Sequence, residues 1–535
     1  MKILKYLYTL LVLPITDSFN RSANAHVKIP DPNLATVVRK ALRLDSNARI
    51  PLKKFQALNH LDGNNSEIRD LTGLEKATGL IELDIYANQI EDLTPLTGLT
   101  QLRDLDLSAN NITDITPLAG LMQLKHLSLG YNKISDITPL TGLKQLKDLG
   151  LGKNQISDIT PLAELAQITE LGLWGNPLSD ITPLAGLTQM KLLNIRQNKI
   201  SDITPLSELT QITNLWLWDN QINDITPLTQ LTQLRYLWLS ENQIRDITPL
   251  AGLTQLITLD CANNQISDIT PLIGLTSVTV LGLGENQIPD IEPLAGLTQL
   301  KQLGITENQI DDITPLAELT QLTELRMGEN QISDITPLIG LTQLIELGLE
   351  KNQISDITPL ANLTQLTNVE FWSNRINNIE PLAKLTRITK LGLGENHITD
   401  IKPLTELTQT TELGLWDNQI SDIEPLANLT QMQLLNIRRN QLRDISSLAN
   451  LKQVTHLWLS GNQINNITPL TGSTQLTHLA LDQNQVSNIS PIENVTSLKH
   501  LAVKENPIQD KEPLQRLLKQ FPNLELDIEL PPADN

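Results

Sequence analysis

A single repeating unit accounts for most of this chain. The unit at 231–252 reads L-T-Q-L-R-Y-L-W-L-S-E-N-Q-I-R-D-I-T-P-L-A-G, and related copies run from Leu99 to Leu514. Aligned copies place an asparagine at Asn88, Asn110 and so on to Asn506, twenty in all, at constant spacing and without insertion or deletion. A fixed period in the twenties is typical of chains whose repeats stack into a solenoid. We therefore expect one elongated repeat domain, although 535 residues would otherwise suggest several domains.

The apolar residues of the unit predict how each turn packs. Seven positions are apolar in nearly every copy, and in this unit they are Leu231, Leu234, Leu237, Leu239, Ile244, Ile247 and Leu250. The alternation around Leu237 and Leu239 predicts a strand over 236–240. A single unit cannot bury these side chains, so successive turns must stack, share a core and pair their strands in parallel.

Three polar or rigid positions of the unit have structural interpretations. The asparagine offers two donors and one acceptor, which suit the backbone groups left unpaired where the chain turns after the strand. Proline follows seven residues later in nineteen of twenty copies, Ser447 being the exception, and it favours turns or 3₁₀ segments over a second sheet. An aspartate, or an asparagine in three copies, stands four residues after the central asparagine in an I-S-x-I-T-P setting, which predicts turn capping rather than calcium binding.

The two ends of the chain depart from the repeat. Residues 1–25 contain Lys2 and Lys5, an apolar run over 6–15 and the sequence A-N-A before His26, which predicts a signal peptide. The apolar run is too short to span a bilayer. We expect residues 26–71 to form a helical cap and a degenerate repeat, 72–510 the array of about 20 repeats, and 511–535 a C-terminal cap.

Both caps are expected to contain amphipathic helices. In the first cap, Asp31 and Pro32 begin a helix, and a shorter helix is expected over 51–57. The first helix should bury one face made of Leu34, Val37, Val38, Ala41 and Leu42. In the C-terminal cap we expect a helix over 512–521 and a last strand over 524–530.

The repeat L-x-x-L-T-Q-L-x-x-L-x-L-x-x-N-x-I-x-D-I-x-P resembles that of the bacterial internalin family, and P-D-P-N-L-A-T-V-V-R-K-A-L followed by L-T-G-L-E-K-A-T-G-L resembles its N-terminal cap. The resemblance implies an α/β solenoid: a right-handed leucine-rich-repeat coil with a parallel β-sheet on the concave face, 3₁₀ and turn segments on the convex face, and a helical N-terminal cap. It also implies binding of another protein on the concave face, often at a cell surface. The immunoglobulin-like segment and wall-anchoring tail of surface-attached members have no counterpart here, so the resemblance does not extend to host-cell adhesion.

The aromatic residues are confined to one face of the predicted sheet. Aromatics make up 3% of the chain, and all seven tryptophans lie either two or four residues before a central asparagine. These positions alternate with the buried leucines and should therefore face outward on the concave side. Part of the pattern is copying, because the E-L-G-L-W that ends at Trp174 recurs eleven repeats later and ends at Trp416.

Copying reduces the seven tryptophans to about five independent observations, which is still more than chance predicts. Exposed tryptophans are enriched where proteins bind partners. The candidate partner-binding residues are Tyr86, Tyr131, Trp174, Arg196, Trp216, Trp218, Tyr236, Trp238, Trp372, Trp416, Arg438 and Trp458.

Glycines and acidic residues complete the predicted surface. Glycine four residues before the asparagine should leave bare backbone for a ligand beside the aromatics. This position is glycine in seven copies: Gly150, Gly172, Gly282, Gly304, Gly348, Gly392 and Gly414. Acidic residues form a border interrupted by Arg196, Arg438 and Arg439, and the border comprises Asp219, Glu241, Glu285, Glu307, Glu329, Glu395 and Asp417. We expect a protein partner with apolar or planar groups and a basic rim.

Two other functions fit the same repeat. Tryptophan and glycine on one face are also typical of carbohydrate binding, so a glycan-binding solenoid remains an alternative. If residues 1–25 were retained, the chain would instead resemble the intracellular leucine-rich-repeat regulatory subunits of eukaryotic phosphatases, whose repeats have the same length. Otherwise we expect a monomer that is secreted, periplasmic or at the cell surface after signal-peptide cleavage.

Composition and motifs argue against several other classes. A formal charge of −20 disfavours nucleic acids and anionic membranes as partners. The single cysteine, Cys261, falls on a core strand position, where we expect a buried, inert thiol. His456, His478 and His500 recur in one straight column, which fits a tetrahedral metal ion poorly. No catalytic motif interrupts the repeat, so we expect no enzyme, no cofactor and no metal.

Overall fold

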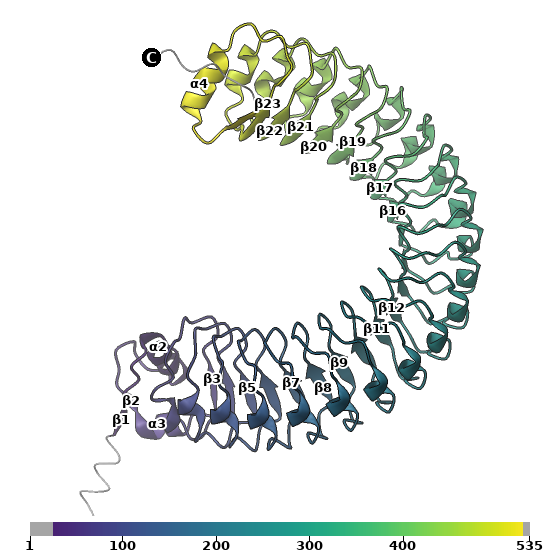
Figure 1. Cartoon of the computed structure of the whole chain (residues 1–535). Helices are drawn as coiled ribbons and strands as arrows, with labels where there is room; N and C mark the ends of the chain where they lie inside the picture. Colours follow the sequence, from purple (N-terminus) through teal and green to yellow (C-terminus); the bar gives the residue numbers. More distant parts are fainter. Residues whose placement is uncertain (1–24, 528–535) are drawn as a thin grey trace, which may run out of the picture. The chain divides into compact units, whose positions relative to one another are not determined.

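The computed structural model describes residues 25–527, and its contacts divide the chain into two compact units. Unit 1 is Met1–Leu256 and unit 2 is Ile257–Asn535. In each unit the strands lie along one side and the 3₁₀ helices along the opposite side (Figure 1). Residues 1–24, with all but the last residue of the predicted signal peptide, lie outside the described range. Within that range, no helix is long and apolar enough to cross a membrane.

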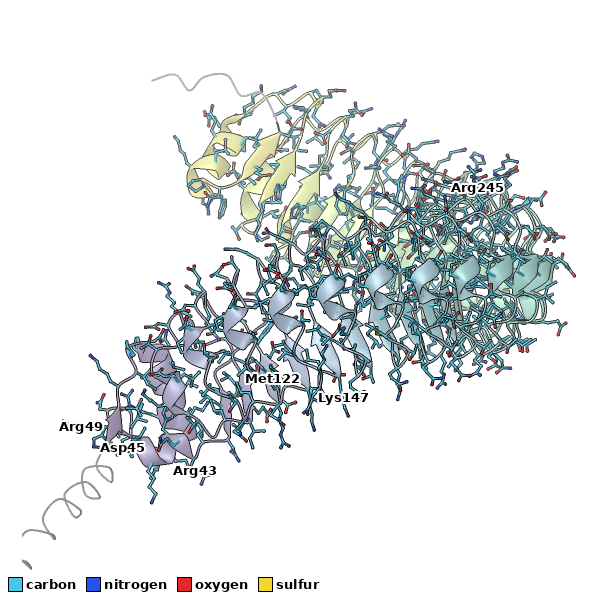
Figure 2. The ribbon with its side chains drawn as sticks, turned by 60° about the horizontal axis from the view of Figure 1, so that its bottom comes forward. Arg43, Asp45, Arg49, Met122, Lys147 and Arg245 are labelled. Carbon is cyan, nitrogen blue, oxygen red and sulfur yellow. The ribbon has the colours of Figure 1, made fainter. Side chains whose placement is uncertain are left out.

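Unit 1 begins with the predicted helical segment. Strand β1 (His26–Val27) pairs antiparallel with β2 (Ile50–Pro51). Helix α2 (Pro32–Ala41) lies between the two strands in the chain, and α3 (Leu52–Gln56) follows β2. In Figure 2, Arg43, Asp45 and Arg49 lie at this end of unit 1. The predicted apolar face of α2 was partly wrong, because Ala35 is buried whereas Ala41 is exposed and Val37 half-buried.

Buried Asp31 joins α2 to the first turn of the repeat. One carboxylate oxygen accepts hydrogen bonds from the N–H groups of Asn33 and Leu34 at 2.8 and 3.0 Å, which caps the helix. The other oxygen accepts from the N–H groups of Arg69 and Asp70 at 2.8 and 3.1 Å. Burial opposes ionisation, but these four hydrogen bonds together lower the pKa of Asp31.

Nine parallel strands and nine 3₁₀ helices follow in unit 1. The strands are β3 (His60–Asp62), β4 (Glu82–Asp84), β5 (Asp104–Asp106), β6 (His126–Ser128), β7 (Asp148–Gly150), β8 (Glu170–Gly172), β9 (Leu192–Asn194), β10 (Asn214–Trp216) and β11 (Tyr236–Trp238). The 3₁₀ helices are η1 (Leu74–Lys76), η2 (Thr94–Leu96), η3 (Thr116–Leu118), η4 (Thr138–Leu140), η5 (Thr160–Leu162), η6 (Thr182–Leu184), η7 (Thr204–Leu206), η8 (Thr226–Leu228) and η9 (Thr248–Leu250).

Unit 2 repeats the same plan. Its parallel strands are β12 (Thr258–Asp260), β13 (Val280–Gly282), β14 (Gln302–Gly304), β15 (Glu324–Arg326), β16 (Glu346–Gly348), β17 (Asn368–Glu370), β18 (Lys390–Gly392), β19 (Glu412–Gly414), β20 (Leu434–Asn436), β21 (His456–Trp458), β22 (His478–Ala480), β23 (His500–Ala502) and β24 (Glu525–Asp527). Its 3₁₀ helices are η10 (Thr270–Leu272), η11 (Glu292–Leu294), η12 (Thr314–Leu316), η13 (Thr336–Gly340), η14 (Thr358–Asn362), η15 (Glu380–Lys384), η16 (Lys402–Leu404), η17 (Glu424–Asn428), η18 (Ser446–Asn450), η19 (Thr468–Gly472) and η20 (Ser490–Asn494).

The last described part of unit 2 is helix α4 (Glu512–Gln520) followed by β24. The helix buries Pro513, Leu514 and Leu517, whereas Leu518 and Phe521 are half-buried. Residues 528–530 of the predicted last strand lie outside the described range.

The predicted parallel sheet with 3₁₀ segments is confirmed, although its strands are shorter than expected. In the unit at 231–252 the strand covers Tyr236–Trp238 rather than 236–240. Hydrogen bonding between turns nevertheless continues beyond the strand, because Leu217 N–H donates to Trp238 O at 2.9 Å and Asp219 N–H to Ser240 O at 3.0 Å. The leucines and isoleucines at the predicted core positions are buried, and so is Cys261, where desolvation raises the pKa of the thiol.

The asparagine column satisfies the backbone between turns, as the sequence predicts. Asn220 Nδ2 donates to Ile195 O of the preceding turn at 3.0 Å and to Leu217 O of its own turn at 2.9 Å. Its Oδ1 accepts from Ile200 N–H at 3.1 Å. The same three contacts recur along the column, so the asparagines belong to the scaffold of the solenoid.

The aspartates four residues later also act as predicted. Asp114 Oδ1 accepts from Thr116 N–H at 2.8 Å at the start of η3, and the hydroxyl and N–H of Thr116 lower the pKa of Asp114. Asn378 makes the equivalent contact with Glu380 N–H at 3.0 Å.

One conformational feature was missed in the sequence. The residue just before the asparagine has a positive φ in nearly every turn, for example Asp219 at 56° and Glu241 at 55°. Glycine occupies this position at Gly175 and Gly461, with φ of 66° and 70°. Little in the sequence signals this conformation, because most residues at this position are not Gly, Asn or Asp, the types that are least strained there.

Candidate partner-binding surface

The outward surface of the sheet, here called the sheet face, is formed by the side chains six, four and two residues before each asparagine. Leu237 and Leu239 point inward and are buried, whereas Tyr236, Trp238 and Ser240 are half-buried on the opposite side of the strand. All seven tryptophans are on this face, and all are half-buried rather than exposed as the sequence suggested. Their rings lie against one another and against the backbone of neighbouring turns.

Unit 1 brings six of these side chains together with Tyr131 and Lys153, which stand directly before their asparagines. The eight residues are here called the unit 1 cluster: Tyr131, Lys153, Trp174, Arg196, Trp216, Trp218, Tyr236 and Trp238. The rings of Tyr131 and Trp174 meet edge to face with centroids 5.2 Å apart. Arg196, one turn beyond Trp174, places its Cζ 4.8 Å from the Trp174 centroid and 5.1 Å from the Trp218 centroid. Lys153 Nζ lies 5.6 Å from the Trp174 centroid. Cations and rings therefore alternate over four successive turns.

A second row of rings lies beside the first. Trp216 and Trp238 stack in parallel, with centroids 4.7 Å apart and an interplanar angle of 5°. The Tyr236 ring is also stacked on Trp238, with centroids 6.2 Å apart and an interplanar angle of 12°. Parallel pairing of β10 with β11 sets this spacing, because Trp216 and Trp238 are register partners. Such ring contacts stabilise by roughly 1 kcal/mol beyond the area they bury.

Some glycines on the sheet face make room for these rings, whereas the glycines predicted to leave bare backbone are only partly covered. A Cβ atom at Gly152 would collide with the Trp174 indole of the next turn, and one at Gly394 with Trp416. Gly414, one of the predicted open positions, is covered by Trp416, and Gly392 is covered by the Glu370 carboxylate. Gly304 does remain open, with nothing within 4 Å. Gly152 and Gly394 were missed, although each stands exactly one repeat before a tryptophan.

Unit 2 has a looser aromatic arrangement. The Trp372 and Trp416 centroids are 6.4 Å apart with rings inclined at 41°. Lys351 Nζ lies 5.2 Å from the Trp372 centroid, and Trp416 Nε1 donates to Glu395 at 3.3 Å. Trp458 contacts His456 instead, with centroids 5.6 Å apart.

A hollow of about 200 Å³ is lined by Trp416 and Trp458, and the carboxyl group of Glu370, which has an unusual pKa, also lines it. Desolvation, together with the charges of Glu350 and Glu412, raises the pKa of Glu370 to about 7, although Lys390 partly opposes this. Lys390 is itself paired with Glu412 at 2.8 Å. A buried oxygen of Glu350 has no hydrogen-bond partner. This acidic site was not found in the sequence, because the burial of Glu370 depends on side chains three turns apart.

The three histidines of unit 2 stack as a column. Centroids of His456 and His478, and of His478 and His500, are 4.1 Å apart, and His500 pairs with Glu525 at 2.6 Å. Desolvation and the two neighbouring imidazoles lower the pKa of His478. A hollow of about 530 Å³ lies against His478, His500 and Trp458. Across residues 25–527, no group of three or more His, Cys, Asp or Glu side chains is arranged to hold a metal ion.

Two of the predicted residues, Tyr86 and Arg438, lie outside the clusters. Tyr86 is 42% exposed and Tyr131, at the edge of the unit 1 cluster, is 56% exposed. Arg438 is exposed on the sheet face. The acidic border is partly neutralised, since Glu329 pairs with Lys351 at 2.6 Å and Asp417 with Arg439 at 3.4 Å.

Comparisons with known proteins place this architecture in a family. A family model described as leucine-rich repeats (2 copies) matches residues 78–120, 123–164, 166–208, 210–252, 232–274, 254–295, 276–318, 320–362, 411–450 and 430–472. The crystal structure of an internalin from Listeria monocytogenes is 35% identical, with 67% of this chain and 94% of the internalin aligned and a TM-score of 0.50. The chain is an internalin-like leucine-rich-repeat protein.

Two more distant structures share the leucine-rich-repeat fold. A leucine-rich-repeat protein from Leptospira interrogans is 21% identical, covering 82% of this chain and 99% of its own, with a TM-score of 0.50. The Arabidopsis receptor kinase HAESA was solved in complex with the peptide hormone IDA and the co-receptor SERK1. It is 19% identical, with 96% of this chain and 89% of the HAESA chain aligned and a TM-score of 0.67. A search of curated proteins found no significant match.

Proposed function

We propose that this internalin-like protein is an exported, non-enzymatic binder of another protein, and that the unit 1 cluster is its main contact. The observation that supports the proposal is the confinement of all seven tryptophans to the sheet face, with stacked, cation-flanked rings in unit 1. Tryptophan, tyrosine and arginine are the residues that contribute most to protein interfaces.

The packing of the unit 1 cluster favours tight binding. Trp216 is held against Trp238, and Trp174 is held between Arg196 and the backbone at Gly152. Side chains that are already ordered lose less conformational entropy on binding, about 0.5–1.5 kcal/mol less for each side chain. Half-buried rings also keep enough accessible surface to contribute on contact.

The same packing argues against a glycan as the principal ligand. Sugars stack on the open faces of aromatic rings, but Trp216 and Trp238 cover a face of each other. Arg196 covers a face of both Trp174 and Trp218. Part of the ring surface on which a sugar would stack is therefore already occupied by neighbouring side chains, which favours a protein partner.

Simultaneous replacement of Trp216, Trp218 and Trp238 by alanine tests this function. The variant should fail to capture the partner in pull-downs from the native environment, while its far-UV circular dichroism stays unchanged because none of the three is a core residue. Tyr86→Ala is the matched control, since it removes an aromatic side chain of the same face outside the cluster. Capture by the triple variant as strong as by the wild type would contradict the proposal.

Two further measurements separate the alternatives. Binding on a glycan array that depends on the three tryptophans, without capture of any protein, would favour the carbohydrate alternative. N-terminal sequencing of the protein from its native source should begin at His26, because the predicted cleavage site follows Ala25. Retention of residues 1–25 would instead favour the intracellular scaffold.

A further inference from the structure

The guanidinium of Arg196 is fixed in position by aromatic side chains rather than by an acid. Arg196 belongs to the turn that lies between the turn of Trp174 and the turn of Trp218. Its Cζ is 4.8 Å from the Trp174 centroid and 5.1 Å from the Trp218 centroid. Cation–π contact on both sides orients the planar group and restricts its rotation.

Arg196 also lacks the polar partner that a half-buried arginine normally has. Its Nε is buried and makes no hydrogen bond, and within residues 25–527 no carboxylate lies in ion-pair contact with this guanidinium. The residue as a whole is only half-buried, so part of its side chain is accessible on the sheet face. This is unexpected in a chain with 60 acidic residues and 40 basic ones. A buried donor without an acceptor is unfavourable, and within residues 25–527 no side chain supplies the guanidinium with an acceptor.

We propose that Arg196 is the recognition site for a carboxylate group of the protein partner, a site that rests on the proposed function of the sheet face. A guanidinium offers parallel N–H donors that match the two oxygens of a carboxylate. Lys153, whose Nζ lies 5.6 Å from the Trp174 centroid, adds a second positive charge to the row. The formal charge of −20 disfavours a doubly charged phosphate here, whereas one carboxylate on an otherwise apolar or basic partner surface is accommodated.

The chain contains its own matched control for this site. Arg438 stands eleven repeats after Arg196, in a second copy of L-L-N-I-R, and Trp416 precedes it as Trp174 precedes Arg196. The residue one turn later is Ser460 rather than tryptophan, so the second ring is missing. Arg438 is exposed, and no cation–π contact is found for it within residues 25–527. The two arginines therefore share a sequence context but differ in preorganisation.

Short peptides added to the full-length protein test the proposal. The probes are acetyl-Trp-Glu-amide, acetyl-Trp-Gln-amide and acetyl-Trp-Gln with a free C-terminal carboxylate, measured by isothermal titration calorimetry at low and high salt. Wild-type protein should bind at least one of the two carboxylate peptides roughly ten-fold more tightly than the neutral peptide, with less discrimination at high salt. Whichever carboxylate peptide binds more tightly shows whether the partner supplies a side-chain carboxylate or a C-terminal carboxylate.

Three variants locate the effect. Arg196→Gln should bind all three peptides equally, Arg196→Lys should lose most of the discrimination because an ammonium group lacks the planar fork, and Arg438→Gln should behave as the wild type. Equal binding of all peptides by the wild type, or no measurable binding of any, would overturn the proposal. Loss of discrimination in Arg438→Gln as large as in Arg196→Gln would also overturn it.

Failure of this inference and failure of the proposed function have different signatures. If the triple tryptophan variant loses the partner while Arg196→Gln binds partner and peptides as the wild type does, the carboxylate site is wrong and the protein-binding surface stands. If Arg196 discriminates between the peptides but the triple tryptophan variant still captures the partner, the carboxylate site stands and the main contact lies elsewhere.

Discussion

A residue on the sheet face is positioned largely by the equivalent residue one repeat earlier. Trp174 lies over Gly152, Trp416 over Gly394, and Arg196 has an indole on either side because both flanking turns supply tryptophan. The side chains at one position therefore form a row, and a change at one turn is transmitted to the next. This explains why a glycine without any ligand contact can control an aromatic site.

Gly152→Ala should displace the Trp174 ring, because its Cβ would occupy the place of the indole. The Arg196 guanidinium would then lose one of its two rings, and we expect reduced discrimination between carboxylate and neutral peptides together with a changed near-UV circular dichroism spectrum. Gly304→Ala is the control, since nothing lies within 4 Å of the Cβ that it adds on the same face. An unchanged near-UV spectrum in Gly152→Ala would show that the ring is not held at this position.

Glu370 should make the stability of unit 2 depend on pH near neutrality. Its pKa is about 7 in the folded chain, compared with an ordinary value of 4.5, because desolvation and then Glu350 and Glu412 disfavour its charge. Between these values the folded state binds more protons than the unfolded state, so the contribution of Glu370 to stability declines as pH rises from about 4.5 to 7.

Backbone hydrogen exchange in β17 and β18, corrected for intrinsic rates, checks this prediction at pH 5 and pH 8. Protection should be lower at pH 8 in the wild type, and Glu370→Gln should flatten the difference. Glu380→Gln, a change at an exposed carboxylate at the start of η15, should keep the wild-type pH dependence. The same pH dependence in Glu370→Gln as in the wild type would contradict the assignment.

At the scale of elements, the repeat predicted what every turn has in common. The alternating leucines, the asparagine and the proline recur in almost every turn, so their partners must be equivalent residues in the next turn. This predicted the strands, the column of asparagine hydrogen bonds and the 3₁₀ helices. The arrangement of the variable residues could not be predicted in this way, because each of their contacts depends on a particular pair of side chains that occurs only once in the repeat array. Arg196 was noticed as a break in an acidic border, yet its two rings were visible as Trp174 and Trp218, one repeat before it and one repeat after it.

The exceptional turn at η18 offers a test of the role of proline. Ser447 occupies the proline position, and its buried Oγ has no hydrogen-bond partner. Ser447→Pro should stabilise this turn by about 1 kcal/mol, because it restricts the unfolded chain and removes a buried, unpaired hydroxyl. Slower hydrogen exchange in β21 and a higher urea midpoint would support this.

The neighbouring position provides the control. Ser446→Pro should destabilise the turn, since Ser446 N–H donates to Asp444 Oδ1 at 2.8 Å and proline has no such donor. Stabilisation by both prolines, or by neither, would contradict the proposed role of the position.

At the scale of the whole molecule, each turn contacts its immediate neighbours, so length should be adjustable in steps of one whole repeat. Removal of residues 287–308 joins Asn286 to Gln309 and restores the usual N-Q-I sequence at the junction. We expect this variant to fold, with protection from hydrogen exchange retained in β13 and β15 and the peptide preference of Arg196 unchanged. Removal of 287–297, half a turn, should abolish protection in both strands because it breaks the register. Similar behaviour of the two deletions would contradict a fold defined by whole turns.

The aspartates that cap the 3₁₀ helices have a consequence for the molecule as a polyelectrolyte. They place one carboxylate on almost every turn in a single line, and neighbours oppose each other's ionisation, as Asp114 does for Asp136. Turns that are roughly 5 Å apart keep these charges within the Debye length of physiological salt, so their mutual repulsion is not fully screened. Such a line should accumulate monovalent cations from solution. Each unit should therefore behave as a polyanion whose resistance to unfolding increases with ionic strength.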